Sequence, residues 1–93
     1  MIKSFRDGET ERVFDRRFSR TLPNDIQTVA LRKLRMLNNA ADLGDLRSPP
    51  ANRLEKLSGD RAGQHSIRIN DQWRICFRWR SGNAQEVEIC DYH

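Results

Sequence analysis

Asp91, Tyr92 and His93 bring a carboxylate, a phenol and an imidazole together at the end of this 93-residue sequence. An imidazole changes its charge between about pH 5 and 8, so it donates or accepts a proton near neutrality. Arg74 stands in a strand-like run that we expect to pair with the segment ending in these residues. A guanidinium group grips phosphate oxygens through two hydrogen bonds. This grouping suits phosphate chemistry and makes a nuclease the first hypothesis.

Two strands must position these groups. From Trp73 to Arg80 the residues alternate strictly, with Trp73, Ile75, Phe77 and Trp79 on one side and Arg74, Cys76, Arg78 and Arg80 on the other. This alternation predicts a strand with one core face and one basic face. Ser81-Gly82-Asn83 reads as a turn, and a second strand returns from Glu86 to Tyr92.

One face of this hairpin must stay apolar, which restricts its register. A turn centred on Asn83 gives these predicted pairs: Trp79 with Val87, Phe77 with Ile89, Cys76 with Cys90, Arg74 with Tyr92, and Trp73 with His93. Strict parity aims Asp91 and His93 toward the core side. They reach Arg74 only if the last residues twist out of the sheet, and the sequence leaves both arrangements open.

Cys76 and Cys90 lack the spacing and the histidine partners of a zinc site, so we expect no metal ligands here. Their predicted cross-strand position is close enough for a disulfide under oxidising conditions. The sequence has no apolar stretch long enough to span a bilayer and no apolar centre of a signal peptide near its start. We therefore expect a cytoplasmic protein without a membrane partner, with both cysteines reduced.

The first half of the sequence predicts two helices. A short strand at residues 2–6 precedes a charged helix from about Asp7 to Arg20 that buries Val13, Phe14 and Phe18. After Leu22-Pro23, a second helix begins at Asn24 or Asp25. Its apolar stripe comprises Ile26, Val29, Ala30, Leu34 and Leu37.

Gly44 and Pro49-Pro50 end the helical part, and strands are expected at Asn52–Leu57 and His65–Asn70. The predicted fold is a single α+β domain over residues 1–93. Its two N-terminal helices pack on one face of a twisted, mainly antiparallel β-sheet.

The net charge of +4 is concentrated in one segment. Residues 53 to 80 contain seven Lys or Arg and three Asp or Glu, and the rest of the chain is balanced. A local positive field favours a polyanionic partner, most plausibly nucleic acid. The candidate phosphate contacts are Arg53, Lys56, Arg61 and Arg68. The alternative is an ordinary solvated strand face.

The block from Asn52 to Ile75, together with Asp91-Tyr92-His93, resembles the HigB toxins of the RelE/ParE superfamily, closest to the GraT-like branch. The resemblance covers nearly the whole chain and implies a RelE-like fold. It implies the toxin of a type II toxin-antitoxin system, an endoribonuclease that needs no metal or other cofactor. Such a toxin cuts mRNA in the A site of the 30S ribosomal subunit, contacts rRNA and inhibits translation. A HigA-type helix-turn-helix antitoxin neutralises it.

The implied reaction is attack by a ribose 2′-hydroxyl on its own phosphate, which needs a base, charge stabilisation and an acid. Arg74 stands at the family's phosphate-binding arginine, although a surface strand arginine is the alternative. His93 is the preferred general acid, or else a solvated residue at the chain end. Asp91 accepts the 2′-hydroxyl proton or orients His93 and Arg74. Tyr92 stacks on a base or packs in the core.

Two family residues are missing, because Glu55 replaces a histidine and Ser58 replaces a lysine. Glu55 is a candidate base in place of the imidazole, or simply an exposed strand glutamate. His65 is a further candidate acid or a structural histidine. Two other functions stay open on the same scaffold: a non-catalytic ParE-like inhibitor of DNA gyrase, and an RNA-binding module without activity.

Overall fold

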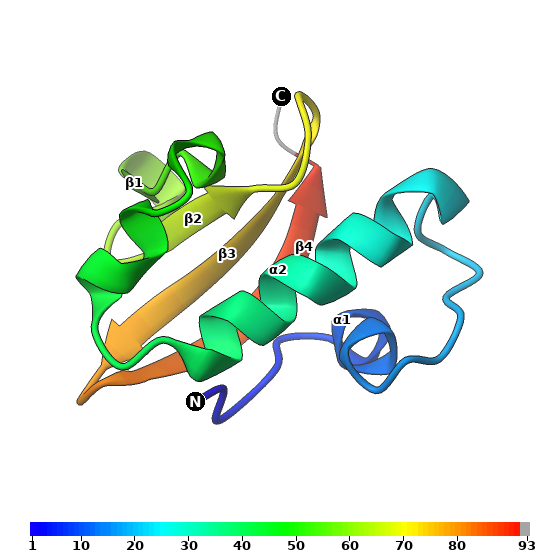
Figure 1. Ribbon diagram of the computed structural model, residues 1–93, viewed down its shortest axis with the longest axis horizontal. Helices are drawn as coiled ribbons and strands as arrows, with labels where there is room; N and C mark the ends of the chain where they lie inside the picture. Colours follow the sequence, from blue (N-terminus) through cyan, green and yellow to red (C-terminus); the bar gives the residue numbers. More distant parts are fainter. Residues whose placement is uncertain (92–93) are drawn as a thin grey trace.

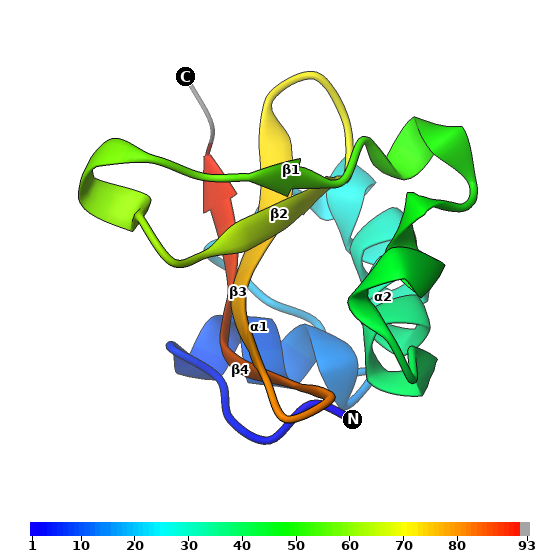
Figure 2. The ribbon, with the colours of Figure 1, turned by 90° about the vertical axis from the view of Figure 1, so that its left-hand side faces the viewer.

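The computed structural model describes residues 1–91 and shows two helices packed against a four-stranded antiparallel sheet (Figures 1 and 2). The strands lie in the order β1-β2-β3-β4. The helices are α1 (Gly8–Phe14) and α2 (Gln27–Asn39), and the strands are β1 (Glu55–Lys56), β2 (His65–Arg68), β3 (Trp73–Arg80) and β4 (Asn83–Asp91). Short 3-10 helices are η1 (Asn24–Ile26), η2 (Leu43–Arg47), η3 (Pro50–Asn52) and η4 (Gly59–Arg61). The predicted α+β architecture is confirmed.

The main core lies between the helices and the sheet. Ala30, Leu34 and Leu37 from the apolar stripe of α2 are fully buried, as are Ile75 and Phe77 of β3. The predicted parity of β3 is therefore confirmed on its apolar face. Burial of these side chains supplies most of the driving force for folding. Within residues 1–91, no helix is long and apolar enough to cross a membrane.

The first helix is shorter than predicted. It ends at Phe14 instead of continuing to Arg20, because Arg16 adopts a left-handed conformation with φ of 64°. This conformation interrupts the helical hydrogen-bond ladder. Phe18 therefore lies outside the helix and is 60% exposed, which corrects the prediction that it is buried. The opening segment forms only two isolated parallel bridges to β4, through Ile2 and Phe5.

The first two strands are also shorter than expected. β1 comprises only Glu55 and Lys56 of the predicted strand Asn52–Leu57. Asn52 is the last residue of η3, and Arg53 turns the chain with φ of 45°. The Asn52 side chain is buried and donates to the carbonyl of Leu46. Asn52 therefore closes a loop instead of starting a strand.

The hairpin register differs from the predicted one. Ser81 and Gly82, both with positive φ, form a two-residue turn that pairs Arg80 with Asn83. Near the middle of the hairpin, one residue of β3 opposes two residues of β4, which is a bulge. The core requires this bulge, because Ala84 and Val87 are both buried. In a regular strand, two residues three positions apart would point to opposite faces.

Consequently, Arg74 pairs with Cys90 and Trp73 pairs with Asp91. The predicted pairs of Arg74 with Tyr92 and of Trp73 with His93 are wrong. Tyr92 and His93 lie outside the described residues, so the roles predicted for them stay predictions.

Cys76 and Cys90 form a disulfide in the structure, which contradicts the expectation that both are reduced. They are diagonal neighbours with a Cα–Cα distance of 6.7 Å, and Cys76 pairs directly with Glu88. Together with Leu57 they form a second, smaller cluster of buried residues. By strand parity this cluster lies on the face of the sheet that points away from the helices.

Candidate active site

Arg74 lies on the same outer face of the sheet, where several hydrogen bonds hold its guanidinium group. Nε donates to Oγ of Ser66 at 2.8 Å, and Nη2 donates to the carbonyl oxygen of Arg53 at 2.6 Å and to that of Ser66 at 3.5 Å. Arg74 is only 5% exposed and Ser66 is fully buried. The expectation of an open basic face is therefore wrong at this residue. The guanidinium plane is instead fixed by its surroundings.

Arg53 contributes to this arrangement through its backbone. It follows η3 in a left-handed conformation, with φ of 45° and ψ of 57°, and its carbonyl accepts from Arg74. A residue other than glycine rarely adopts this conformation, so the surrounding structure must stabilise it. The side chain of Arg53, a predicted RNA contact, is exposed.

Glu55 is the predicted site residue that lies close to Arg74. It pairs with Ser66 across the β1-β2 ladder, and its Oε1 is 3.8 Å from Nη1 of Arg74. Its side chain is 46% exposed, in contrast to the buried guanidinium. The structure thus brings an accessible carboxylate beside a fixed cation, at the position where the family resemblance implies a histidine.

Asp91 lies one residue beyond the partner of Arg74. It is exposed and pairs with Trp73, and its Oδ2 accepts from Nε2 of Gln72 at 3.1 Å. Because successive strand residues point to opposite faces, the register assigns Asp91 to the Trp73 face. Among the described site residues, Arg74 and Glu55 are therefore together, and Asp91 lies at the adjoining strand end.

The four predicted phosphate contacts differ in their surroundings. Arg61 forms an ion pair with Glu88 at 2.9 Å, and Arg68 forms one with Asp71. Arg53 and Lys56 have exposed side chains. Neither Arg53 nor Lys56 forms an ion pair within residues 1–91, so each can offer its charge to a phosphate without giving up a partner carboxylate. Arg53 and Lys56 are thus better disposed than the other two for such contacts.

His65 is half-buried, whereas a general acid in contact with solvent would be exposed. Its Nδ1 has no hydrogen-bond partner within the described part of the chain, and its ring stacks on Phe77 with centroids 6.2 Å apart. Burial, and next the nearby charge of Lys56, lower the pKa of His65 below its ordinary value. These features favour the structural interpretation of His65.

Ser66 was not singled out from the sequence, because its importance depends on the strands that flank it. Its neighbours in the ladder are Glu55 on β1 and Cys76 on β3, and its hydroxyl reaches Arg74 diagonally. Only a known strand register reveals this contact. Between Met1 and Asp91, no three His, Cys, Asp or Glu side chains gather as potential metal ligands.

The fold is that of the RelE-like toxins. The toxin-antitoxin structure titled "YoeB-YefM complex from Staphylococcus aureus" aligns with a TM-score of 0.60 and 16% identity, covering 100% of this chain and 98% of that chain. A heterotetrameric YoeB-YefM complex from the same organism aligns with a TM-score of 0.56 and 20% identity, with the same coverage. At these identities the likeness concerns the fold.

Sequence comparisons identify the family of RelE-like toxins to which the chain belongs. The family model described as "RelE-like toxin of type II toxin-antitoxin system HigB" matches residues 3–93. Toxin HigB-1 of Vibrio cholerae is 40% identical over 85 residues, which cover 90% of each chain. Endoribonuclease HigB of Proteus vulgaris is 32% identical over 94 residues and is covered completely, as is this chain. The chain therefore belongs to the HigB-like toxins of type II toxin-antitoxin systems.

Proposed function

We propose that this toxin is a ribosome-dependent endoribonuclease that cleaves mRNA in the ribosomal A site and so inhibits translation. The observation that carries the proposal is the fixed guanidinium group of Arg74 with the carboxylate of Glu55 at 3.8 Å. The Proteus vulgaris relative, matched over the whole chain, is named an endoribonuclease, which supports the same activity.

In the proposed reaction, a ribose 2′-hydroxyl attacks the adjacent phosphorus, and the bond to the 5′ oxygen of the next nucleotide breaks. The products are a 2′,3′-cyclic phosphate and a free 5′-hydroxyl. A base takes the 2′-hydroxyl proton, an acid protonates the leaving oxygen, and a cation stabilises the charge that builds on the phosphorane. The protein supplies all three functions from side chains.

Arg74 is the proposed cation. Its anchoring by Ser66 and by the Arg53 carbonyl means that its charge needs no rearrangement when the transition state forms. Glu55 is the proposed base, because it is accessible and next to Arg74. His93 is the proposed acid, and Tyr92 is proposed to stack on a base of the mRNA. Asp91 stands on the Trp73 face at the strand end next to Arg74, and its proposed role is to orient His93.

The proposed partners are a HigA-type helix-turn-helix antitoxin, the ribosome and mRNA in the cytoplasm. The Staphylococcus aureus structures that share this fold are complexes of a toxin with its antitoxin, which supports an antitoxin partner for this chain. Arg53, Lys56, Arg61 and Arg68 are proposed to contact phosphates of rRNA and mRNA. Such contacts position the protein without selecting a sequence.

The test is primer extension on a defined mRNA in a reconstituted translation reaction. Cleavage within codons at the A site is expected with the wild-type toxin, and none is expected when ribosomes are omitted. Inhibited translation with intact mRNA contradicts the proposal and favours inhibition by binding alone. A supercoiling assay with DNA gyrase then tests the ParE-like alternative.

A further inference from the structure

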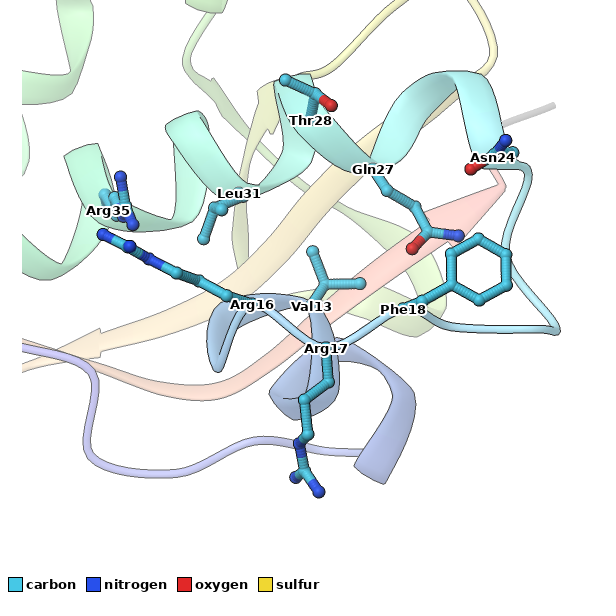
Figure 3. A pocket seen from close by; sticks show the side chains of 9 residues that line it. All are labelled: Val13, Arg16, Arg17, Phe18, Asn24, Gln27, Thr28, Leu31 and Arg35. Atoms are coloured by element: carbon cyan, nitrogen blue, oxygen red, sulfur yellow. The ribbon is translucent and has the colours of Figure 1, made fainter.

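A hollow of about 500 Å³ lies between the end of α1 and the outer face of α2 (Figure 3). Leu31 contributes apolar surface, Val13 lines the hollow from the core with only 3% of its surface exposed, and Arg16, Arg35 and Phe18 stand around it. The helices that form it cover one face of the sheet, whereas Arg74 lies on the other face. This hollow is therefore separate from the candidate active site.

The loop that carries Phe18 is fixed by Gln27. Oε1 of Gln27 accepts from the Ser19 amide at 3.0 Å, and its Nε2 donates to the carbonyls of Ser19 at 2.8 Å and Leu22 at 3.0 Å. Ser19 is fully buried, yet the adjoining Phe18 is 60% exposed. The aromatic ring is thus held at the edge of the hollow by an ordered loop. An exposed aromatic ring beside a hollow is a feature of binding surfaces.

Arg16 and Arg35 bring two positive charges to the same place. Figure 3 shows their guanidinium ends pointing toward one another. Neither side chain makes an ion pair or hydrogen bond with any residue from Met1 to Asp91, whereas the neighbouring Arg17 pairs with Asp15 at 3.4 Å. Like charges that line the same hollow repel each other. An anion between them relieves this repulsion, and a carboxylate accepts from guanidinium groups through both of its oxygens.

We propose that this hollow binds an acidic, partly apolar segment of the antitoxin. A carboxylate of the segment lies between Arg16 and Arg35, and an apolar side chain packs against Phe18 and Leu31. The inference rests on the proposed function in taking an antitoxin as the partner. It adds the site on the toxin and the chemistry of the segment that occupies it.

The surface suits a peptide better than a nucleic acid. A phosphate backbone is bound by a series of cations, each of which neutralises one phosphate. Of the three arginines that line the hollow, Arg17 is paired with Asp15, which leaves Arg16 and Arg35 for a single anionic group. The apolar side chains of Phe18 and Leu31 match an aliphatic residue of a protein. Because this hollow and Arg74 lie on opposite faces, a segment bound here leaves Glu55 uncovered.

The test measures the affinity of the toxin for the proposed HigA-type antitoxin, by isothermal titration calorimetry. The double variant Arg16→Glu/Arg35→Glu is expected to raise the dissociation constant on the order of 100-fold, since it places carboxylates opposite an acidic segment. Phe18→Ser is expected to raise it on the order of tenfold without a change of charge. The control is Arg32→Glu/Arg80→Glu, which makes the same charge change at exposed residues outside the hollow.

Thermal unfolding followed by circular dichroism establishes that each variant is folded. Unchanged antitoxin affinity in folded Phe18→Ser and in the Arg16/Arg35 variant overturns the inference. Weakened binding to ribosomes or to an mRNA oligonucleotide, with antitoxin affinity unchanged, also overturns it and assigns the hollow to nucleic acid. The Arg16/Arg35 variant is expected to retain wild-type mRNA cleavage. A wild-type toxin that cleaves no mRNA contradicts the proposed activity, whereas the antitoxin titration still decides this inference.

Discussion

At the scale of single residues, the sequence predicts a role for Arg74 but not the environment of its side chain. Its residue type and the family resemblance predict a phosphate ligand, and this role stays a prediction. Its burial could not be predicted, because Ser66 and the Arg53 carbonyl reach it only through the fold. The left-handed conformation of Arg53 likewise has no signal in the sequence.

Ser66→Ala is expected to destabilise the fold. This change leaves Nε of Arg74 without its acceptor in a buried position, which costs about 1–3 kcal/mol of unfolding free energy. Chemical denaturation measures this loss. Ser48→Ala, at an exposed serine whose hydroxyl makes no hydrogen bond within residues 1–91, is the control and is expected to be neutral.

If Ser66 positions Arg74 for catalysis, its substitution also lowers the rate of mRNA cleavage. At a temperature where the variant is fully folded, Ser66→Ala is expected to slow mRNA cleavage about tenfold, because the guanidinium plane is no longer fixed. Cleavage at the wild-type rate by the folded variant would show that Ser66 serves stability alone.

His65 predicts a pH dependence of stability. Burial lowers the pKa of His65 below the ordinary value of 6.5, so below that pH the unfolded chain binds a proton more readily than the folded chain. The stabilisation is complete above pH 6.5 and is lost as the pH falls toward the lowered folded pKa. Denaturation at pH 7.5 and 5.5 should show a smaller decrease for His65→Gln than for the wild type. Equal decreases would rule out His65 as the source.

At the scale of elements, the sequence predicts the hairpin in kind but not in register. The alternation from Trp73 to Arg80 correctly identifies the core face of β3. A turn centred on Asn83 is wrong, because the two positive φ values fall on Ser81 and Gly82. The bulge follows from the burial of Ala84 as well as Val87, which a strict period of two does not accommodate. A small error in turn geometry thus moves Arg74 by two positions relative to β4.

The backbone conformations of two glycines predict opposite effects of alanine substitution. Gly82 has φ of 77°, so Gly82→Ala is expected to destabilise the fold by about 1 kcal/mol, because alanine is strained in this region. Gly8 lies in α1, where an added Cβ meets no atom within 4 Å, so Gly8→Ala is expected to stabilise by about 0.5–1 kcal/mol. Unfolding midpoints of the two variants measure both effects. A stabilising Gly82→Ala would contradict the turn geometry.

The residue at which α1 ends could not be predicted from the sequence. Charged residues up to Arg20 have adequate helix propensity, and nothing in Arg16 marks it as a helix terminator. The termination follows from tertiary contacts, among which Gln27 binds the backbone of Ser19 and Leu22. This early ending exposes Phe18 and forms the hollow of Figure 3.

At the scale of the whole molecule, the sheet separates two proposed roles. The outer face carries Arg74 and Glu55, and the helical side carries the hollow between Arg16 and Arg35. The general architecture was predictable from periodicity and from the family resemblance, because both describe long segments. The accessibility of the proposed site was not, since it depends on how loops and ion pairs such as Arg61–Glu88 cover the sheet.

The most direct measurement is the rate of mRNA cleavage on programmed ribosomes in single turnover, compared among wild type, Arg74→Ala and Arg74→Lys. Loss of a preorganised charge is expected to slow cleavage by about 10²–10³-fold in Arg74→Ala. Arg74→Lys is expected to restore little, because an ammonium group lacks the planar donors that Ser66 and Arg53 hold. Wild-type cleavage by folded Arg74→Ala would contradict the account.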